Sequence, residues 1–194
     1  EKPKANENKK LIPIEKYGIK CMSIGFLIGE DTPTIWRGPM IMKALEQMYN
    51  GVEWGNLDYL IIDLPPGTGD AQITLAQSSK LTGSIIVSTP QDIALIDARK
   101  AINMFRRVEV PVLGMVENMS YFICSNCEQR HEIFSYGGAR KDAEKFEINF
   151  LGELPLDKNL RIYSDEGKPI CISEPGSDVA KSYFKIAENL KNII

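Results

Sequence analysis

The sequence contains no uninterrupted apolar run that approaches the length needed to cross a bilayer, and no signal peptide is visible. It has no excess of basic residues either: the net charge is −3 and the pI is near 5.4, which argues against nucleic acid as the main partner. Four cysteines are too few for a disulfide scaffold in a chain of 194 residues. We therefore expect a soluble, intracellular protein that binds neither a membrane nor a nucleic acid.

A second absence concerns phosphate binding. The chain has no Gly-x-x-x-x-Gly-Lys-[Ser/Thr] motif, whose backbone and lysine hold the phosphates of a nucleotide in P-loop ATPases. Its only Gly-Lys pair, Gly167-Lys168, is followed by Pro169 in a surface-like stretch. We expect that a polypeptide of this sequence alone does not hydrolyse ATP, because it lacks the lysine and the Mg²⁺-binding hydroxyl.

The residues that are present suit a globular protein, with 43% hydrophobic and 25% charged residues. Residues 1–10 are polar and lysine-rich and predict a linker or a disordered terminus, whereas residues 11–194 predict one domain. Apolar, β-branched runs predict strands at 18–28, 58–64, 83–88, 111–116 and 150–154. Helical spacing of apolar residues predicts helices at 39–49, 71–79, 93–108, 139–146, 157–163 and 177–193. This alternation predicts an α/β fold, a parallel, doubly wound sheet covered by helices on both faces.

The stretch from Asp58 to Asp70 is the first candidate site. An apolar run ends at Asp63, and a Pro-Pro-Gly-Thr-Gly segment follows that can continue neither a strand nor a helix. A carboxylate at the carboxyl end of a buried parallel strand lies where open α/β sheets bind ligands, and such an acid can hold Mg²⁺ in phosphate chemistry. The plain alternative is a buried strand and a turn in which Asp63 only caps a neighbouring backbone group.

Two further polar segments follow predicted strands, Thr89 to Asp92 and Glu117-Asn118. We expect them to gather at the same edge of the sheet as Asp63. The amide of Asn118 can donate to and accept from the edge of a nucleobase. The alternative is that Asn118 is an ordinary turn residue, which is the commoner role of asparagine in a loop.

The second candidate site is Cys124-Ser125-Asn126-Cys127. Two thiolates at this spacing can bind one soft metal, but iron and zinc sites usually have four ligands. A two-fold dimer in which each copy supplies Cys124 and Cys127 would complete the set. The alternatives are a zinc knuckle that adds His131, the only histidine, or a thioredoxin-like redox pair, which the position in a long loop disfavours. Cys21 and Cys171 lie in apolar runs, and we expect them to be small buried hydrophobic residues.

Several motifs in order show that the chain resembles Mrp/ApbC-type proteins, P-loop ATPases of the MinD/ParA class that carry iron–sulfur clusters. The resemblance runs from about Ile12 to the C-terminus. The matching segments are Tyr17 to Lys20, Trp36 to Met40, Asp58 to Asp70, Ser88 to Asp92, Glu117 to Tyr121, His131 to Phe134 and Ser164 to Ile170. The chain departs from the family pattern at Ser125 and Glu128, where the family commonly has Pro and Gly.

The resemblance implies roles that the residues alone do not. It implies ATP and Mg²⁺ as cofactors of the full-length protein, with the Gly67 N–H near the γ-phosphate, Asn118 on the adenine, and Pro155 to Asp157 close to the base. It also implies a [4Fe–4S] cluster that bridges a homodimer through Cys124 and Cys127. The family's P-loop lies upstream of the matching part, so the chain resembles a protein that starts after it. Loss of that strand would expose a strand edge and apolar faces, and we expect either aggregation or a packing at that edge that differs from the family's.

The function expected from these features is that of an iron–sulfur cluster carrier or scaffold, with apo iron–sulfur proteins and cluster-assembly factors as partners. A non-catalytic zinc-binding or protein-interaction module is the alternative. A MinD-like spatial organiser is disfavoured, because it has no need of the cysteine pair. We expect a cytoplasmic location, or else the mitochondrial matrix. No role can be given to Arg37 from the sequence.

Overall fold

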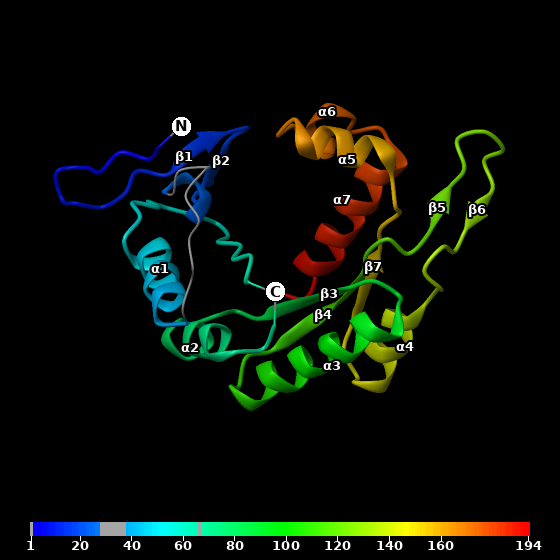
Figure 1. Ribbon diagram of the computed structural model, residues 1–194, viewed down its shortest axis with the longest axis horizontal. Helices are drawn as coiled ribbons and strands as arrows, with labels where there is room; N and C mark the ends of the chain where they lie inside the picture. The colour runs from blue at the N-terminus through cyan, green and yellow to red at the C-terminus, as the bar shows by residue number, and fades with distance from the viewer. Residues whose placement is uncertain (1, 28–37, 66) are drawn as a thin grey trace. The chain divides into compact units, whose positions relative to one another are not determined.

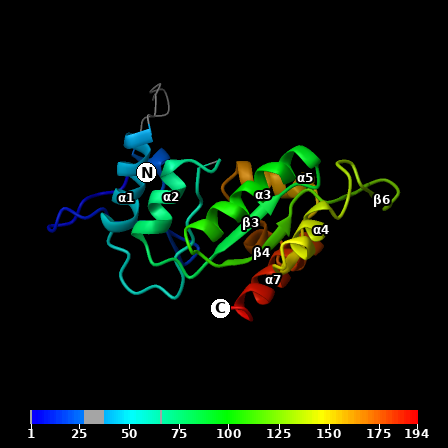
Figure 2. The same cartoon turned by 90° about the horizontal axis from the view of Figure 1, so that it is seen from below.

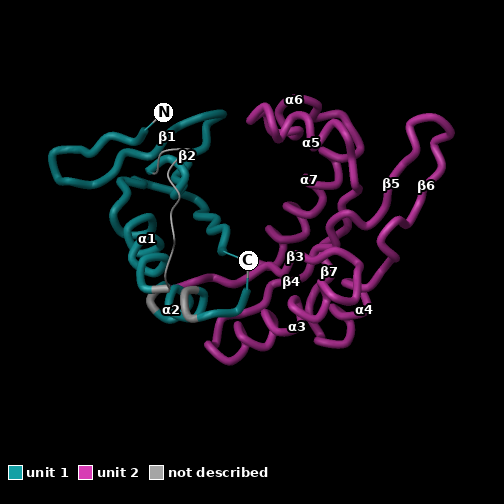
Figure 3. Tube along the Cα trace, in the orientation of Figure 1, with its two compact units in different colours: residues 1–79 teal, residues 80–194 magenta. Residues whose placement is uncertain are grey.

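The computed structural model describes residues 2–27, 38–65 and 67–194 (Figure 1). The chain forms two compact units, Glu1–Ser79 and Lys80–Ile194 (Figure 3). The assignment of 1–10 as a linker and 11–194 as one domain stays a prediction. Trp36 and Arg37 lie outside the described residues. Among the described helices, none is long and apolar enough to span a membrane.

The first unit is built from short elements. Its described elements are β1 (Ile14–Lys16), β2 (Ile19–Cys21), the 3₁₀ helix η1 (Ile24–Phe26), α1 (Gly38–Asn50) and α2 (Asp70–Ser78). β1 and β2 pair antiparallel through a tight turn at Tyr17 and Gly18, both of which have positive φ. The two helices pack against each other, and α1 confirms the helix predicted from residue 39. The N-cap of α2 is Gly69, so the predicted helix start is one residue off.

Two predicted strands of the first unit are wrong. Within the described part of the 18–28 run, which ends at residue 27, the only strand is the three-residue β2, followed by η1, and Cys21 on β2 is exposed rather than buried. Residues 58–64 form no strand: Ile61 is 78% exposed and Tyr59 58% exposed. An extended segment becomes a strand only when a neighbour accepts and donates its ladder hydrogen bonds, and no described residue pairs with this one.

The second unit contains the predicted parallel sheet. Its three strands lie in the order β3-β4-β7, with β3 at Ser84–Ser88, β4 at Val112–Glu117 and β7 at Phe150–Glu153, and both pairings are parallel. The remaining described elements are α3 (Asp92–Arg107), β5 (Phe122–Ile123), β6 (Arg130–His131), α4 (Gly138–Lys145), α5 (Lys158–Asp165), α6 (Ile170–Ser173) and α7 (Asp178–Lys191). Each strand or helix predicted between residues 83 and 193 is present, with ends shifted by a few residues.

Helices cover both faces of this sheet, as expected for a doubly wound fold. α3 and α4 pack together on one face, and α7 packs on the other against β4 and β7 (Figures 1 and 2). The predicted apolar stripe of α7 serves this packing: Tyr183, Ile186 and Leu190 contact the buried cluster of Val116, Leu151 and Leu154. The stripe is therefore part of the core.

The cysteine loop is a hairpin that projects from the sheet (Figure 1). β5 and β6 pair antiparallel, and the loop between them closes through two backbone bonds: Cys124 N–H donates to Gln129 O at 3.0 Å, and Glu128 N–H donates to Cys124 O at 2.8 Å. Glu128 has φ 58°, a left-handed conformation that favours glycine. The departure from the family pattern at this position therefore introduces local strain.

Replacing Glu128 by glycine should relieve that strain. We expect Glu128→Gly to stabilise the hairpin by about 0.5 kcal/mol, because the ~1 kcal/mol cost of the left-handed conformation exceeds the added entropy of the unfolded chain. Slower hydrogen exchange of the Cys124 and Glu128 amides would show this. Ser125→Gly is the matched control: it adds chain entropy at a position without positive φ and should speed the same exchange. Equal effects of the two variants would contradict the prediction.

The β3 strand provides a second test. It is the outer strand of the described sheet, and Val87 is 60% and Ile85 37% exposed on the face away from the buried Ile86. An outer strand with exposed apolar side chains on one face promotes association. Val87→Lys should lower light scattering of the concentrated protein and its binding of a hydrophobic dye, whereas Lys80→Arg should change neither. A protein that stays monomeric and binds no dye without substitution would refute the expectation of aggregation.

Candidate functional site

The carboxyl ends of the three parallel strands meet at one edge of the second unit. Asn118 N–H donates to Ser88 O at 2.7 Å, and Leu154 N–H donates to Glu117 O at 2.8 Å. Two further bonds continue the contact past the strand ends, from Ser120 N–H to Leu154 O at 2.9 Å and from Leu156 N–H to Tyr121 O at 2.7 Å. The prediction that the segments following these strands gather at one edge is therefore confirmed within this unit.

The residues predicted to surround a base already have structural partners there. Asn118 is half-buried, and its side-chain oxygen accepts from Met119 N–H at 2.9 Å, as in a turn. Pro155 is buried. Asp157 is the N-cap of α5, and its carboxylate accepts from Leu160 N–H at 2.7 Å. The structure brings these three residues to one edge, and their contact with a nucleotide stays a prediction.

Asp63 and Gly67 belong to the first unit. Asp63 is exposed and follows no strand, so its expected position at the end of a buried strand is wrong. Gly67 has φ 100° in a loop that is tied to α2 by the bond from Gln72 Nε2 to Pro65 O, 2.8 Å long. A side chain at Gly67 would be strained whatever the space around it. The roles of both residues toward Mg²⁺ and phosphate stay predictions.

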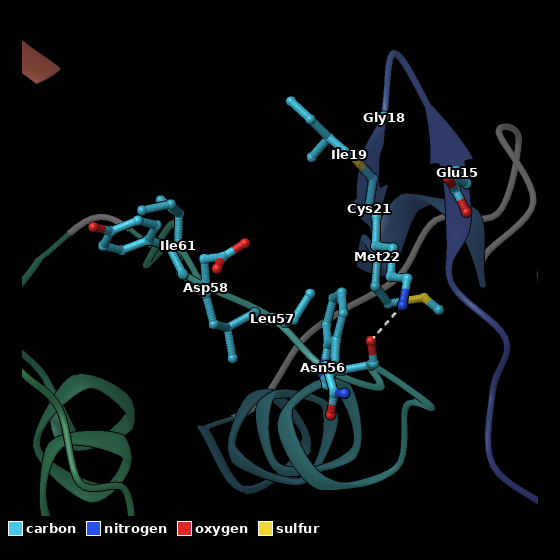
Figure 4. Close-up of a pocket in the computed structure, with 13 residues that line it drawn as sticks. Glu15, Gly18, Ile19, Cys21, Met22, Asn56, Leu57, Asp58 and Ile61 are labelled. Carbon is cyan, nitrogen blue, oxygen red and sulfur yellow. Dashed lines mark hydrogen bonds between the residues drawn. The ribbon is translucent and has the colours of Figure 1, made fainter.

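The first unit also contains an open pocket of about 550 Å³ (Figure 4). Its walls are the β1–β2 hairpin and the segment 54–61, which are joined by the bond from Lys20 Nζ to Trp54 O, 2.7 Å long. Leu57 and Ile61 lie on the side opposite the hairpin residues Ile19 and Cys21 in the close-up. Its lining includes Asp58 to Ile61, the start of the first candidate stretch, but neither Asp63 nor Gly67.

A buried carboxylate organises the strand-end edge; its position there was predicted from the sequence, but its role was not. Glu117, at the end of β4, has no solvent exposure. Its two carboxylate oxygens accept from Gly137 N–H at 3.0 Å and from Ala139 N–H at 2.8 Å, at the start of α4. The hydroxyl of Ser120, also fully buried, donates to it at 2.6 Å. Glu117 thus caps α4 in place of a local side chain, since Gly137 at the N-cap has none.

A second carboxylate continues this network to the cysteine hairpin. Glu153 of β7 lies 3.2 Å from the Ser120 hydroxyl and forms an ion pair with Arg130 of β6, 3.2 Å long. The pKa of Arg130 lies above its usual value: burial alone would lower it, but the hydrogen bond and charge of Glu153 outweigh this effect. Nothing in the sequence connects these two residues, since Arg130 lies in the predicted loop and Glu153 in a predicted strand.

The cysteine pair lies at the tip of the hairpin. Cys124 is half-buried and Cys127 is exposed. The backbone N–H groups of Asn126 and Cys127, and then the Cys127 thiol, hydrogen-bond to the Cys124 sulfur and lower the pKa of this thiol. The thiolate is the form that binds metal. Among residues that the structure describes, no group of three or more His, Cys, Asp or Glu side chains could hold a metal, so His131 does not complete a set with the pair.

Comparison with known proteins agrees with this arrangement. The family model described as ParA, NUBPL iron-transfer P-loop NTPase, matches residues 1–191. The chain is 53% identical over 190 residues to "Iron-sulfur protein required for NADH dehydrogenase, mitochondrial" of Arabidopsis thaliana, covering 98% of this chain and 61% of the relative. It is 50% identical to the "Iron-sulfur cluster carrier protein" of Escherichia coli K12, covering 98% of this chain and 52% of the relative.

Solved structures support the same fold. A nucleotide-binding protein from Archaeoglobus fulgidus, in complex with ADP and with cobalt found, is 40% identical with a TM-score of 0.73, covering 91% of this chain and 68% of that one. The MinD cell division ATPase of Pyrococcus furiosus is 21% identical with a TM-score of 0.58, covering 79% and 58%, and shows likeness of fold alone.

The family and the fold class predicted from the motifs are thus confirmed. The chain spans about half to three fifths of the length of the curated relatives it matches. The family model covers residues 1–191, nearly the whole chain, and the chain therefore belongs to the ParA-type family of NUBPL iron-transfer P-loop NTPases.

Proposed function

We propose that this chain is part of an iron–sulfur cluster carrier that holds a [4Fe–4S] cluster between two copies and delivers it to apoproteins. The observation that carries the proposal is the Cys124–Cys127 pair at the tip of a projecting hairpin, where the backbone N–H groups of Asn126 and Cys127 lower the pKa of the Cys124 thiol. These donors stabilise negative charge on sulfur, as suits a thiolate that ligates iron.

The number of ligands supports a shared cluster. One copy offers two thiols at this place, and no third metal-binding side chain joins them among the described residues. A [4Fe–4S] cluster usually needs four thiolates, so two copies related by a two-fold axis supply a complete set. The cluster is cargo: its exposed position at the hairpin tip allows an apoprotein to reach it. The names of the Arabidopsis and E. coli relatives, an iron–sulfur protein and a cluster carrier, agree with this assignment.

Nucleotide binding is the second part of the proposal. In the full-length protein, Asp63 and Gly67 would act on Mg²⁺ and the γ-phosphate of ATP, and Asn118, Pro155 and Asp157 would lie around the base. The edge that carries Asn118 and Pro155 is closely bonded to the base of the cysteine hairpin, which gives a nucleotide a route to influence the cluster. We place the protein in the cytoplasm or the mitochondrial matrix. The name of the Arabidopsis relative contains the word mitochondrial.

Anaerobic reconstitution with iron and sulfide tests the cluster. The protein should take up about two iron atoms per chain, form dimers and gain a broad charge-transfer band. Cys124→Ser and Cys127→Ser should each abolish the band, because two thiolates are lost from every dimer. Cys171→Ser, which changes a half-buried thiol on α6, is the control and should retain it. Colourless uptake of zinc by the same two cysteines would instead establish the alternative, a zinc-binding module.

Phosphate release tests the nucleotide part. The 194-residue polypeptide should release no phosphate from ATP above the rate in buffer, because it contains no Gly-Lys-[Ser/Thr]. Asp63→Asn should give the same baseline. Turnover by the unsubstituted polypeptide that disappears in Asp63→Asn would overturn the expectation and would locate the active carboxylate.

A further inference from the structure

Arg130 occupies an unusual position at the base of the cysteine hairpin. Its guanidinium carbon lies 3.9 Å from the centre of the Tyr121 ring and 4.7 Å from that of Tyr136. Its two terminal nitrogens lie 3.2 and 3.5 Å from the two carboxylate oxygens of Glu153. One side chain of β6 therefore contacts the chain entering the hairpin, the chain leaving it, and the neighbouring strand β7 of the sheet.

These contacts reinforce one another. An exposed ion pair alone contributes little to stability, and the Arg130 side chain is 37% exposed. Here the flat guanidinium lies against two aromatic rings, which restrict its rotation and add cation–π attraction. Glu153 is fixed in turn by its place on β7, where it pairs with Glu117 of β4. Arg130 therefore loses little side-chain entropy when its two terminal nitrogens contact the Glu153 carboxylate. This ion pair keeps its geometry better than an isolated ion pair would.

Arg130 is also closely connected to the ligands. In the β5–β6 pairing its partner is Ile123, the residue that precedes Cys124. Gln129, the residue before Arg130, accepts the N–H of Cys124 at 3.0 Å. The position of Arg130 thus determines where the first cysteine of the pair leaves the two-stranded part of the hairpin.

We propose that Arg130 is a positioning residue that clamps the Cys124–Cys127 hairpin to β7, through Glu153 and between Tyr121 and Tyr136. This inference rests on the proposed function for its consequence, which is retention of the cluster. Four thiolates from two copies must reach one cluster together, and a hairpin that moves at its base makes that arrangement entropically costly.

The clamp itself is tested on the metal-free protein. Arg130→Met removes the charge and the fork but keeps an apolar chain of similar length. It should speed hydrogen exchange of the Cys124 and Glu128 amides by about five- to tenfold, while amides of α3 stay unchanged. Arg161→Met, which breaks an exposed ion pair on α5, is the control and should leave the hairpin amides unaffected. Unchanged exchange in Arg130→Met would overturn the inference whether or not the protein binds a cluster.

The consequence is tested on the reconstituted protein. Arg130→Met should take up iron and sulfide but lose the charge-transfer band to a chelator about five- to tenfold faster than the unsubstituted protein, in proportion to the exchange rate. Arg130→Lys keeps the charge over the rings and should restore part of the lifetime. Equal lifetimes in all three proteins would refute the positioning role. If the unsubstituted protein forms no cluster, the proposed function fails, and the exchange experiment still decides on the clamp.

Discussion

The burial of the Glu117 carboxylate is the constraint on which the functional part of the second unit depends. A carboxylate without solvent exposure costs several kcal/mol unless hydrogen bonds replace its water. Glu117 obtains them from Gly137 N–H, Ala139 N–H and the Ser120 hydroxyl, at the positively polarised start of α4. These bonds join the end of β4 to the start of α4, so residues 118–136 form a long loop whose two ends are held together. The cysteine hairpin lies within this loop, and both ends of the loop are therefore fixed.

The sequence predicted the second unit well because its signals are local. The β-branched run of β3, the apolar spacing of α3 and the stripe of α7 each report burial on one face, and parallel strands with intervening helices follow from their order. The strand predicted at 58–64 failed for a reason that no run of apolar residues can reveal. Apolar character shows that a segment suits a buried strand, but the neighbour that would hydrogen-bond to it must come from elsewhere in the fold.

The candidate sites show the same division between signals that are local in the sequence and contacts that depend on the fold. Cys124 and Cys127 were identified because their spacing is itself the signal, and the Asp157 N-cap is a pattern of neighbouring residues. The capping role of Glu117 and the ion pair of Arg130 were not predicted, because their partners lie 20 to 23 residues away, at Gly137 and Glu153. Such contacts depend on which strand ends meet. Glu128 was noted as a departure from the family pattern, yet only the backbone shows that it bears a left-handed conformation.

The Ser120 hydroxyl lies between the carboxylates of Glu117 and Glu153 and has a single hydrogen to donate. Its oxygen lies 2.6 Å from a Glu117 oxygen and 3.2 Å from a Glu153 oxygen, and it can donate to only one of them at a time. The shorter distance assigns the hydrogen to Glu117, so Glu153 depends on Arg130 to balance its charge. Asn118 and Ser120 belong to the same turn. A ligand that displaces this turn must therefore disturb the Glu117 bond, and the hydroxyl then becomes available to Glu153. Arg130 is paired with Ile123 in the hairpin, so a change in its contact with Glu153 lies one residue from Cys124.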